Sequence, residues 1–240
     1  MLKAVLFDLD GTLLDIDLEP FLRDYFALLG PVVARLLDSA DPAIGLAAVV
    51  RGTEAMSGVH PGQTNRDVFN STFIEMTGLD LGVGEAARSI AAFYEEQFPS
   101  LQRSHRQRDG AADAVAASRE LGLKVALATN PIFPHAAIQE RARWAGFDLD
   151  DFDFVTSYEN SYACKPSPEY FRRVASELGV SPSECMMVGD DAVLDLGSVD
   201  AGMRSFYVGP SRDPLLREVA HWVGDLPDVA TLIRAMRPDG

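Results

Sequence analysis

The amino-acid sequence predicts an α/β protein: a doubly wound parallel sheet with helices on both faces and an all-helical module inserted into it. Three observations support this fold class. Short apolar runs alternate with helical patterns through the second half of the chain, which is typical of parallel sheets. A similar apolar run lies at the N-terminus, at residues 4–7. Between about residues 17 and 100 the apolar residues follow helical spacing instead, and no convincing strand occurs.

The first predicted strand, residues 4–7, is apolar on both faces and is closed by Asp8, as expected of a buried parallel strand. Further runs of this kind lie at residues 124–128, 185–188 and 204–208, with a weaker one at 152–156. Ligands of such sheets bind beyond the carboxyl ends of the strands. Polar residues directly after these runs are therefore the candidates for function.

Helical patterns separate the predicted strands and lie at residues 111–121, 135–144, 168–178, 191–202 and 225–233. The clearest follows Ser167, a natural N-cap with Pro168 at the first helical position, and it stops at Gly179. Within the inserted module, residues 21–29 fit one helical face, and Gly30-Pro31 is expected to interrupt that helix. We therefore predict a core domain formed by 1–16 and 101–240, and a helical domain at 17–100.

Composition and charge exclude several classes of function. The 240-residue chain is 47% hydrophobic and carries a formal net charge of -15, from 21 basic and 36 acidic residues. Such an acidic protein is a poor candidate for binding nucleic acid or an anionic membrane through its charge. Cys164 and Cys185 provide no disulfide framework, and no signal peptide or membrane span is evident. We expect a cytoplasmic protein.

Two acidic clusters follow predicted strands. Asp8-Leu9-Asp10-Gly11-Thr12 comes directly after the first strand, and Gly189-Asp190-Asp191, with Asp195 beyond it, comes after a later one. Neighbouring carboxylates repel one another unless a cation compensates them, and oxygen-rich clusters of this kind suit Mg²⁺. An aspartate can also accept a phosphoryl group covalently. Taken alone, the first cluster is equally well explained as a turn with solvated acids.

Three further residues favour a phosphate site. Thr129 and Asn130 follow the strand at 124–128 and offer a hydroxyl and a backbone N–H. Lys165, in a chain that has only three lysines, directly precedes the capped helix that begins after Ser167. A lysine ahead of a helix N-terminus is a reasonable ligand for phosphate.

These residues resemble the four motifs of the haloacid dehalogenase-like (HAD) hydrolase superfamily: Asp8-Leu9-Asp10-Gly11-Thr12, Thr129-Asn130, Lys165-Pro166, and Gly189-Asp190 with Asp195. The motifs occur in the family's order and span nearly the whole chain. The inserted module resembles the helical C1 cap of that superfamily. The resemblance implies a Rossmann-like core and a phosphatase that hydrolyses a small phosphorylated metabolite, with a mobile cap that selects the substrate.

The resemblance also implies a role for each residue. Asp8 is the nucleophile that forms an aspartyl-phosphate, and Asp10 protonates the leaving oxygen and then activates water. Mg²⁺ is held by Asp8, the backbone carbonyl of Asp10 and Asp190, and is supported by Asp195 and Asp191; whether Asp191 touches the metal is left open. The phosphoryl group is bound by Leu9, Thr129, Asn130 and Lys165.

Asp10 narrows the activity within the superfamily. Haloacid dehalogenases keep the first aspartate and lack the second, so a carboxylate at this position favours phosphoryl transfer. Two alternatives remain. A phosphoglucomutase-like phosphotransferase shares both aspartates. A phosphoacceptor signalling protein without turnover uses similar residues, although receiver domains are much shorter and lack the insert. The physiological substrate and the oligomeric state are not predicted.

Two residues of the inserted module, His60 and Arg66, lie in a polar, turn-rich stretch. They either face the substrate from the cap or belong to an ordinary surface loop between helices, and the second interpretation is favoured.

Overall fold

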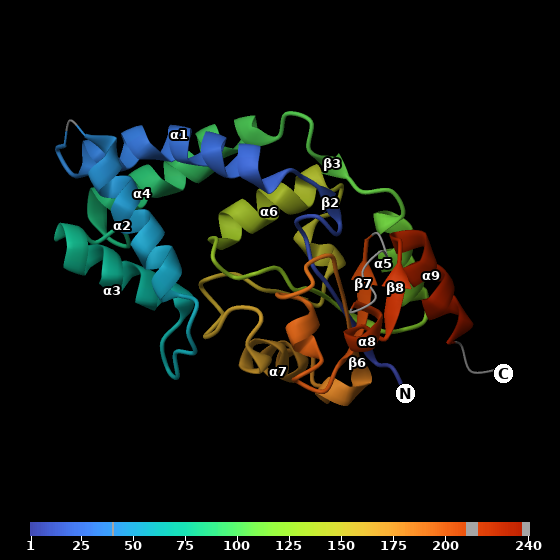
Figure 1. Ribbon diagram of the computed structural model, residues 1–240. Helices are drawn as coiled ribbons and strands as arrows, with labels where there is room; N and C mark the ends of the chain where they lie inside the picture. Colours follow the sequence, from blue (N-terminus) through green and yellow to red (C-terminus); the bar gives the residue numbers. More distant parts are fainter. Residues whose placement is uncertain (40, 210–215, 237–240) are drawn as a thin grey trace.

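The computed structural model describes residues 1–39, 41–209 and 216–236. Its centre is a six-stranded sheet in the order β5-β4-β1-β6-β7-β8, and all neighbouring strands in it are parallel. The strands are β1 (Ala4–Phe7), β4 (Lys124–Leu127), β5 (Phe154–Val155), β6 (Cys185–Gly189), β7 (Arg204–Val208) and β8 (Trp222–Gly224). The flanking helices are α5 (Ala111–Glu120), α6 (His135–Trp144), α7 (Pro168–Glu177), α8 (Leu216–Val219) and α9 (Leu226–Ala235) (Figure 1). The predicted fold class is confirmed.

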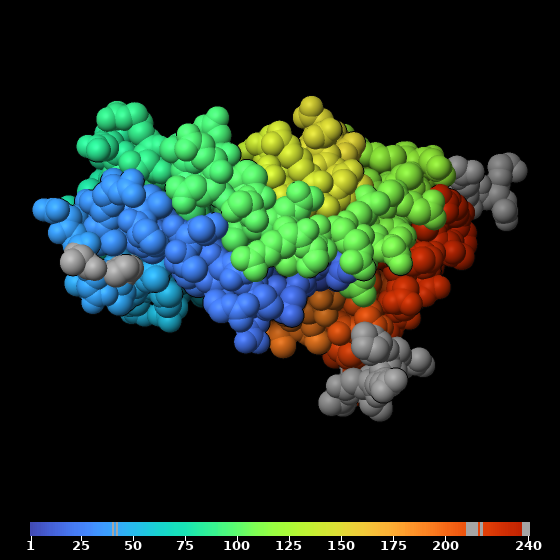
Figure 2. Space-filling view, turned by 90° about the horizontal axis from the view of Figure 1, so that it is seen from above, coloured from blue at the N-terminus to red at the C-terminus, as the bar shows by residue number. Residues whose placement is uncertain are grey.

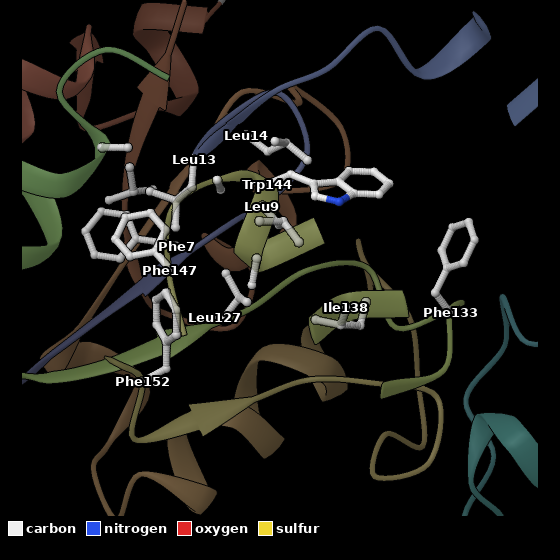
Figure 3. Close-up of a cluster of buried hydrophobic side chains, with 14 of the residues drawn as sticks. Phe7, Leu9, Leu13, Leu14, Leu127, Phe133, Ile138, Trp144, Phe147 and Phe152 are labelled. Atoms are coloured by element: carbon white, nitrogen blue, oxygen red, sulfur yellow. The ribbon is translucent and has the colours of Figure 1, made fainter. Parts of the chain in front are cut away.

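Strand β1 is fully buried because hydrophobic clusters pack on both of its faces. Val5 and Phe7 belong to the larger cluster, which includes side chains of α5 and α9 and aromatic residues such as Phe147 (Figure 3). Ala4 and Leu6 belong to a second cluster with side chains of α7. Successive residues of a strand point to opposite faces, so these two clusters explain why the run is apolar throughout.

A helical segment, residues 18–101, is inserted between two short strands, β2 (Leu14–Asp15) and β3 (Arg106–Gln107). These strands pair antiparallel, Leu14 with Gln107 and Asp15 with Arg106. The segment contains α1 (Leu18–Leu36), α2 (Pro42–Ala55), α3 (Asn65–Thr77) and α4 (Gly84–Ala92), then a π-helical turn (Phe93–Gln97) and a 3₁₀ turn (Phe98–Leu101). It forms one end of the elongated molecule (Figures 1 and 2). Whether it is a separate domain stays a prediction.

The expected interruption at Gly30-Pro31 was wrong, because α1 continues through Pro31. Proline removes one helical hydrogen bond and usually kinks or ends a helix. Here Phe21, Tyr25, Leu29 and Val33 recur every four residues and are all buried on one face of α1. Packing of this face on both sides of Pro31 outweighs the lost bond, an effect that local sequence signals do not reveal.

The helix expected at residues 191–202 was also wrong: this stretch contains only a 3₁₀ turn, Leu196–Ser198. Aspartate side chains accept hydrogen bonds from backbone N–H groups that would otherwise bond to carbonyls within a helix. Asp191 Oδ1 accepts hydrogen bonds from the N–H groups of Val193 and Leu194, at 2.7 and 2.8 Å. Asp195 Oδ2 accepts one from the N–H of Asp191 at 3.0 Å. Such local bonds compete with helix formation.

Other sequence signals match the structure more closely. Ser167 caps α7 by accepting a hydrogen bond from the N–H of Glu169, with Pro168 at the first helical position. Cys164 and Cys185 are both buried free thiols. Within the described ranges, no helix is both long enough and apolar enough to span a bilayer. Strands β2, β3 and β8, and helices α2 and α8, were not predicted.

Candidate active site

Three neighbouring strands bring the predicted site residues to one edge of the sheet. Asp8 directly follows β1, Thr129 lies just after β4, and Asp190 directly follows β6. These strands are neighbours at the centre of the sheet, in the order β4-β1-β6, so their carboxyl ends lie side by side. Lys165 reaches this edge from the loop before α7.

Lys165 joins two aspartates in a buried ion-pair network. Its Nζ lies 2.6 Å from Asp8 Oδ1 and 2.6 Å from Asp195 Oδ1. Burial raises the pKa of Asp8 well above its usual value, and the Lys165 ammonium opposes that rise. Burial disfavours the charged form of Lys165 too, but Asp195 and Asp8 together raise its pKa above the ordinary value. Lys165 is therefore a fixed positive charge between the two carboxylates.

Asp190 completes a cluster of three carboxylates. One ligand oxygen each from Asp8, Asp190 and Asp195 lies within 4.8 Å of the others. The hydroxyl of Thr12 donates to Asp190 Oδ1 at 3.0 Å. Burial is the main cause that raises the pKa of Asp190 to about 6; repulsion from Asp195 adds to the rise, and the Thr12 hydroxyl and the Arg108 charge oppose it.

Gly11 lets Asp190 come this close. Its φ of +82° belongs to the left-handed region that favours glycine, and a β-carbon here would collide with the Asp190 carboxylate. Only glycine fits at position 11 of the first motif, because Asp190 of the fourth motif lies against it. The two residues are 179 positions apart in the sequence.

Asp195 and Asp191 occupy different surroundings. Asp195 is buried, and both of its oxygens have protein partners: Lys165 Nζ on Oδ1 and the N–H of Asp191 on Oδ2. It is thus better placed to orient Lys165 than to bind a cation. The Asp191 side chain accepts the hydrogen bonds of the following turn and is not a member of the carboxylate cluster.

Thr129 and Asn130 are held by the surrounding loops. The carbonyl of Thr129 accepts hydrogen bonds from the hydroxyls of Tyr170 and Thr156, both at 2.8 Å. Asn130 Oδ1 accepts one from the backbone N–H of Lys165 at 3.2 Å. The second and third motifs are therefore tied together, which fixes the lysine backbone beside the cluster.

Arg141 on α6 is a site residue that sequence reasoning missed. Its side chain is 1% exposed, and its Nη1 donates to Asp10 Oδ2. The guanidinium lies 4.4 Å from the ring centroid of Phe133, a favourable cation–π position. Among the described residues, neither Asp10 Oδ1 nor Arg141 Nη2, both buried, has a hydrogen-bond partner. Asp10 is thus held through one oxygen, and the other is free for a ligand.

A sequence signal for Arg141 did exist. It lies four positions after Ala137 and three after Ile138, so it falls on the apolar face of the helix. Arg143, only two residues later, is more than half exposed and pairs with Glu140. An arginine on a buried helical face requires a buried acidic partner, although the sequence does not say which one.

A family model for haloacid dehalogenase-like hydrolases matches residues 2–199. The chain belongs to this family. It is 27% identical over 210 residues to "Putative phosphatase YhcW" of Bacillus subtilis, covering 87% of this chain and 84% of the relative. It is also 27% identical over 241 residues to the N-acetylmuramic acid 6-phosphate phosphatase of Pseudomonas aeruginosa, covering 94% and 89%.

Solved structures share the fold of this HAD-like hydrolase. A HAD phosphatase from Thermococcus onnurineus superimposes with a TM-score of 0.60 at 21% identity, covering 97% of this chain and 98% of the other. The L-2-haloacid dehalogenase of Xanthobacter autotrophicus gives 0.56 at 21% identity, covering 99% and 100%. The likeness to these structures therefore shows the fold alone. With its phosphatase-named relatives, the chain is a hydrolase of the phosphatase type.

The stretch with His60 and Arg66 lies between α2 and α3 and is largely exposed, as expected of a surface loop, but its backbone is also bonded to the core. Residues 59–66 run along the core loop at 158–164. Backbone N–H groups of His60, Asn65 and Arg66 donate across this contact, to the carbonyls of Tyr162, Ser161 and Tyr158 at 2.7–2.8 Å. The helical segment is thereby held to the site edge of the sheet as well as through β2 and β3.

Asn65 is the buried centre of this contact, at 0% exposure. Its Nδ2 donates to the carbonyl of Pro131 at 3.0 Å, one residue beyond the second motif. We expect Asn65→Ala to lower the free energy of unfolding by about 1–3 kcal/mol, because the buried carbonyl of Pro131 loses its donor. Denaturant titration measures this. Ser71→Ala in the same helix removes only a local bond to Val68 and is the control; equal effects of the two would contradict the prediction.

Proposed function

We propose that the chain hydrolyses phosphoric monoesters of small metabolites through a covalent aspartyl-phosphate on Asp8, with Mg²⁺ as cofactor. The observation that carries this proposal is the arrangement of the two motif aspartates. Asp8 lies beside Asp190 and forms an ion pair with Lys165 through its Oδ1. Asp10 forms an ion pair with Arg141 through its Oδ2. Each aspartate keeps its second oxygen for chemistry, one as a nucleophile and one for proton transfer.

The proposed reaction has two balanced halves. A carboxylate oxygen of Asp8 forms a bond to phosphorus while the bond to the leaving oxygen breaks, and Asp10 gives that oxygen a proton. A water molecule then attacks the same phosphorus and passes a proton to Asp10. The bond from phosphorus to Asp8 breaks, which releases inorganic phosphate and regenerates both aspartates. Family resemblance, rather than geometry, selects Asp8 over Asp10 as the nucleophile.

The surrounding residues fit a divalent cation. Hard cations prefer oxygen ligands, and the cluster places three carboxylates within reach of one cation. Asp8, Asp190 and the backbone carbonyl of Asp10 would hold Mg²⁺, which when bound neutralises charge on these groups and on the phosphoryl oxygens. Asp195 orients Lys165 from outside the ligand set. Asp191 supports the turn that carries Asp195.

Phosphate binding is assigned to groups around Asp8. We propose that Leu9, Thr129, Asn130 and Lys165 contact the phosphoryl oxygens, with Lys165 offsetting the negative charge that the transition state spreads over them. The helical segment, held over this edge by the 59–66 loop, is proposed to act as a mobile cap that excludes water and selects the substrate. A cytoplasmic location is also proposed.

Metal removal tests the cofactor assignment. We expect EDTA treatment to reduce hydrolysis of p-nitrophenyl phosphate by roughly a hundredfold or more, and added Mg²⁺ to restore it, because the carboxylate cluster would otherwise repel the phosphoryl group. Nitrophenol and inorganic phosphate are measured together and are expected in equal amounts. Hydrolysis that persists without metal contradicts the cofactor assignment. Nitrophenol formed without matching phosphate would indicate a phosphotransferase instead.

A further inference from the structure

A largely apolar cavity of about 340 Å³ lies between the helical segment and the loops at the site edge of the sheet. Its core wall consists of Ile132, Phe133 and Pro134, which follow the second motif after Pro131, and of Tyr158, which comes shortly after β5. The opposite wall is formed by apolar side chains of α1, α2, α3 and α4. A concave apolar cavity of this size beyond the strand ends is suited to bind a small organic group.

Phe133 connects this cavity to the reacting groups. Its ring lines the cavity, and the Arg141 guanidinium, 4.4 Å from the ring centroid, is paired with Asp10. In Figure 3, Phe133 lies at the side of the drawn cluster that faces the teal part of the helical segment. Only the Phe133 side chain therefore separates the cavity from Arg141. Arg141 in turn holds Asp10, the proposed proton donor to the leaving group.

Four of the polar side chains that line the cavity are already paired with protein atoms. The hydroxyls of Tyr25 and Tyr94 lie 2.9 Å apart and bond to each other. Thr53 donates to the carbonyl of Val49 at 2.9 Å, and Glu54 pairs with Arg51 at 3.1 Å. The other polar side chains of the lining are Arg66, Asn70 and Tyr158, and the rest of the lining is apolar. A ligand hydroxyl that faces the apolar part of the wall would lose its water without gaining a partner, which is costly.

We propose that this cavity receives the leaving group of the substrate, and that this group is hydrocarbon in character, aliphatic or aromatic, rather than a polyhydroxylated sugar. The inference rests on the proposed function of the Asp8 site and adds the substrate class. It departs from the sugar phosphate named for the Pseudomonas aeruginosa relative. The apolar lining selects for hydrocarbon area, and a polyhydroxylated group would bury hydroxyls against apolar side chains.

A matched pair of substrates tests the proposal. Cyclohexylmethyl phosphate and glucose 6-phosphate both carry the phosphate on a primary carbon next to a six-membered ring, and differ in the ring oxygen and the hydroxyl groups. We expect kcat/KM to be higher for cyclohexylmethyl phosphate by on the order of tenfold or more. Equal values, or a preference for the sugar, would overturn the proposal even though the phosphatase function stands.

A variant of Val50 tests whether the leaving group binds in this cavity. Val50 lines the cavity and is 43% exposed, so Val50→Trp narrows the cavity without disturbing a buried core position. We expect it to lower kcat/KM for cyclohexylmethyl phosphate about tenfold. Hydrolysis of acetyl phosphate, whose leaving group is too small to fill the cavity, should stay unchanged. Ile44→Trp, on the same helix at 56% exposure and outside the cavity lining, is the control and should change neither rate.

The outcomes separate the two proposals. If Val50→Trp and Ile44→Trp behave alike on cyclohexylmethyl phosphate, the cavity is not the leaving-group site. If the parent protein releases phosphate from none of these compounds in the presence of Mg²⁺, the proposed function itself fails. Loss of acetyl phosphate hydrolysis in Val50→Trp would show damage beyond the cavity and would also overturn the assignment.

Discussion

Asp8→Asn is expected to reduce phosphate release by roughly a thousandfold or more, because an amide cannot act as the nucleophile that accepts the phosphoryl group. The change keeps the shape of the side chain and its place beside Lys165. Rapid quenching followed by mass measurement should find the parent protein transiently heavier by one phosphoryl group. The Asp8→Asn variant should show no such species.

The control for this result is Asp113→Asn. Asp113 lies on α5, is more than half exposed and pairs with Arg234, so its loss should leave the rate of phosphate release unchanged. Comparable activity in Asp8→Asn and the parent would remove Asp8 from the mechanism. A phosphoryl group found on the Asp8→Asn protein would point to Asp10 as the acceptor instead.

Arg141→Met is expected to have the second largest effect. It leaves the Asp10 carboxylate without its buried partner, and breaking such a pair typically costs about 3 kcal/mol or more in the free energy of unfolding. We also expect kcat to fall by about a hundredfold with little change in KM, because a carboxylate that is no longer held in place donates its proton poorly. Denaturant titration and steady-state kinetics measure the two effects separately.

A double-mutant comparison separates positioning from stability. In an Asp10→Asn background, Arg141→Met should reduce kcat little further, because its effect acts through the missing carboxylate. Arg141→Lys keeps a positive charge and should recover part of the lost kcat. Arg143→Met, on the same helix but exposed, is the control and should change neither kcat nor stability appreciably. Full additivity of the Asp10 and Arg141 effects would contradict the positioning role.

The strands and motifs were largely predictable, because both depend on local signals. A run such as Ala4–Phe7 is apolar on both faces only if the strand is covered on both faces, and the structure has this arrangement. The polar residues after β1, β4 and β6 then meet because parallel strands end at one edge. The strand ends therefore placed the candidates at one edge of the sheet, and the family resemblance grouped them into one site, although the order of the strands was not predicted.

Features that depend on distant partners were not predictable. The persistence of α1 through Pro31 depends on the buried face of Phe21, Tyr25, Leu29 and Val33, and not on local propensity. The pairing of Arg141 with Asp10 joins residues 131 positions apart. Strand β8 is only three residues long and is recognisable chiefly by its pairing with β7. A single sequence contains the residues of these contacts without indicating their partners.

The pairing of β2 with β3 has a consequence for how this chain can be remodelled. The two points where the helical segment leaves and rejoins the core are neighbours in one antiparallel ladder, about 5 Å apart. The ends of the insert therefore coincide in space, although more than eighty residues separate them in sequence. A short turn could join the same two strands, and so could a different insert whose ends lie equally close. If the helical segment selects the substrate as proposed, replacing it at this junction is expected to change the substrate preference while the residues at the strand ends stay in place.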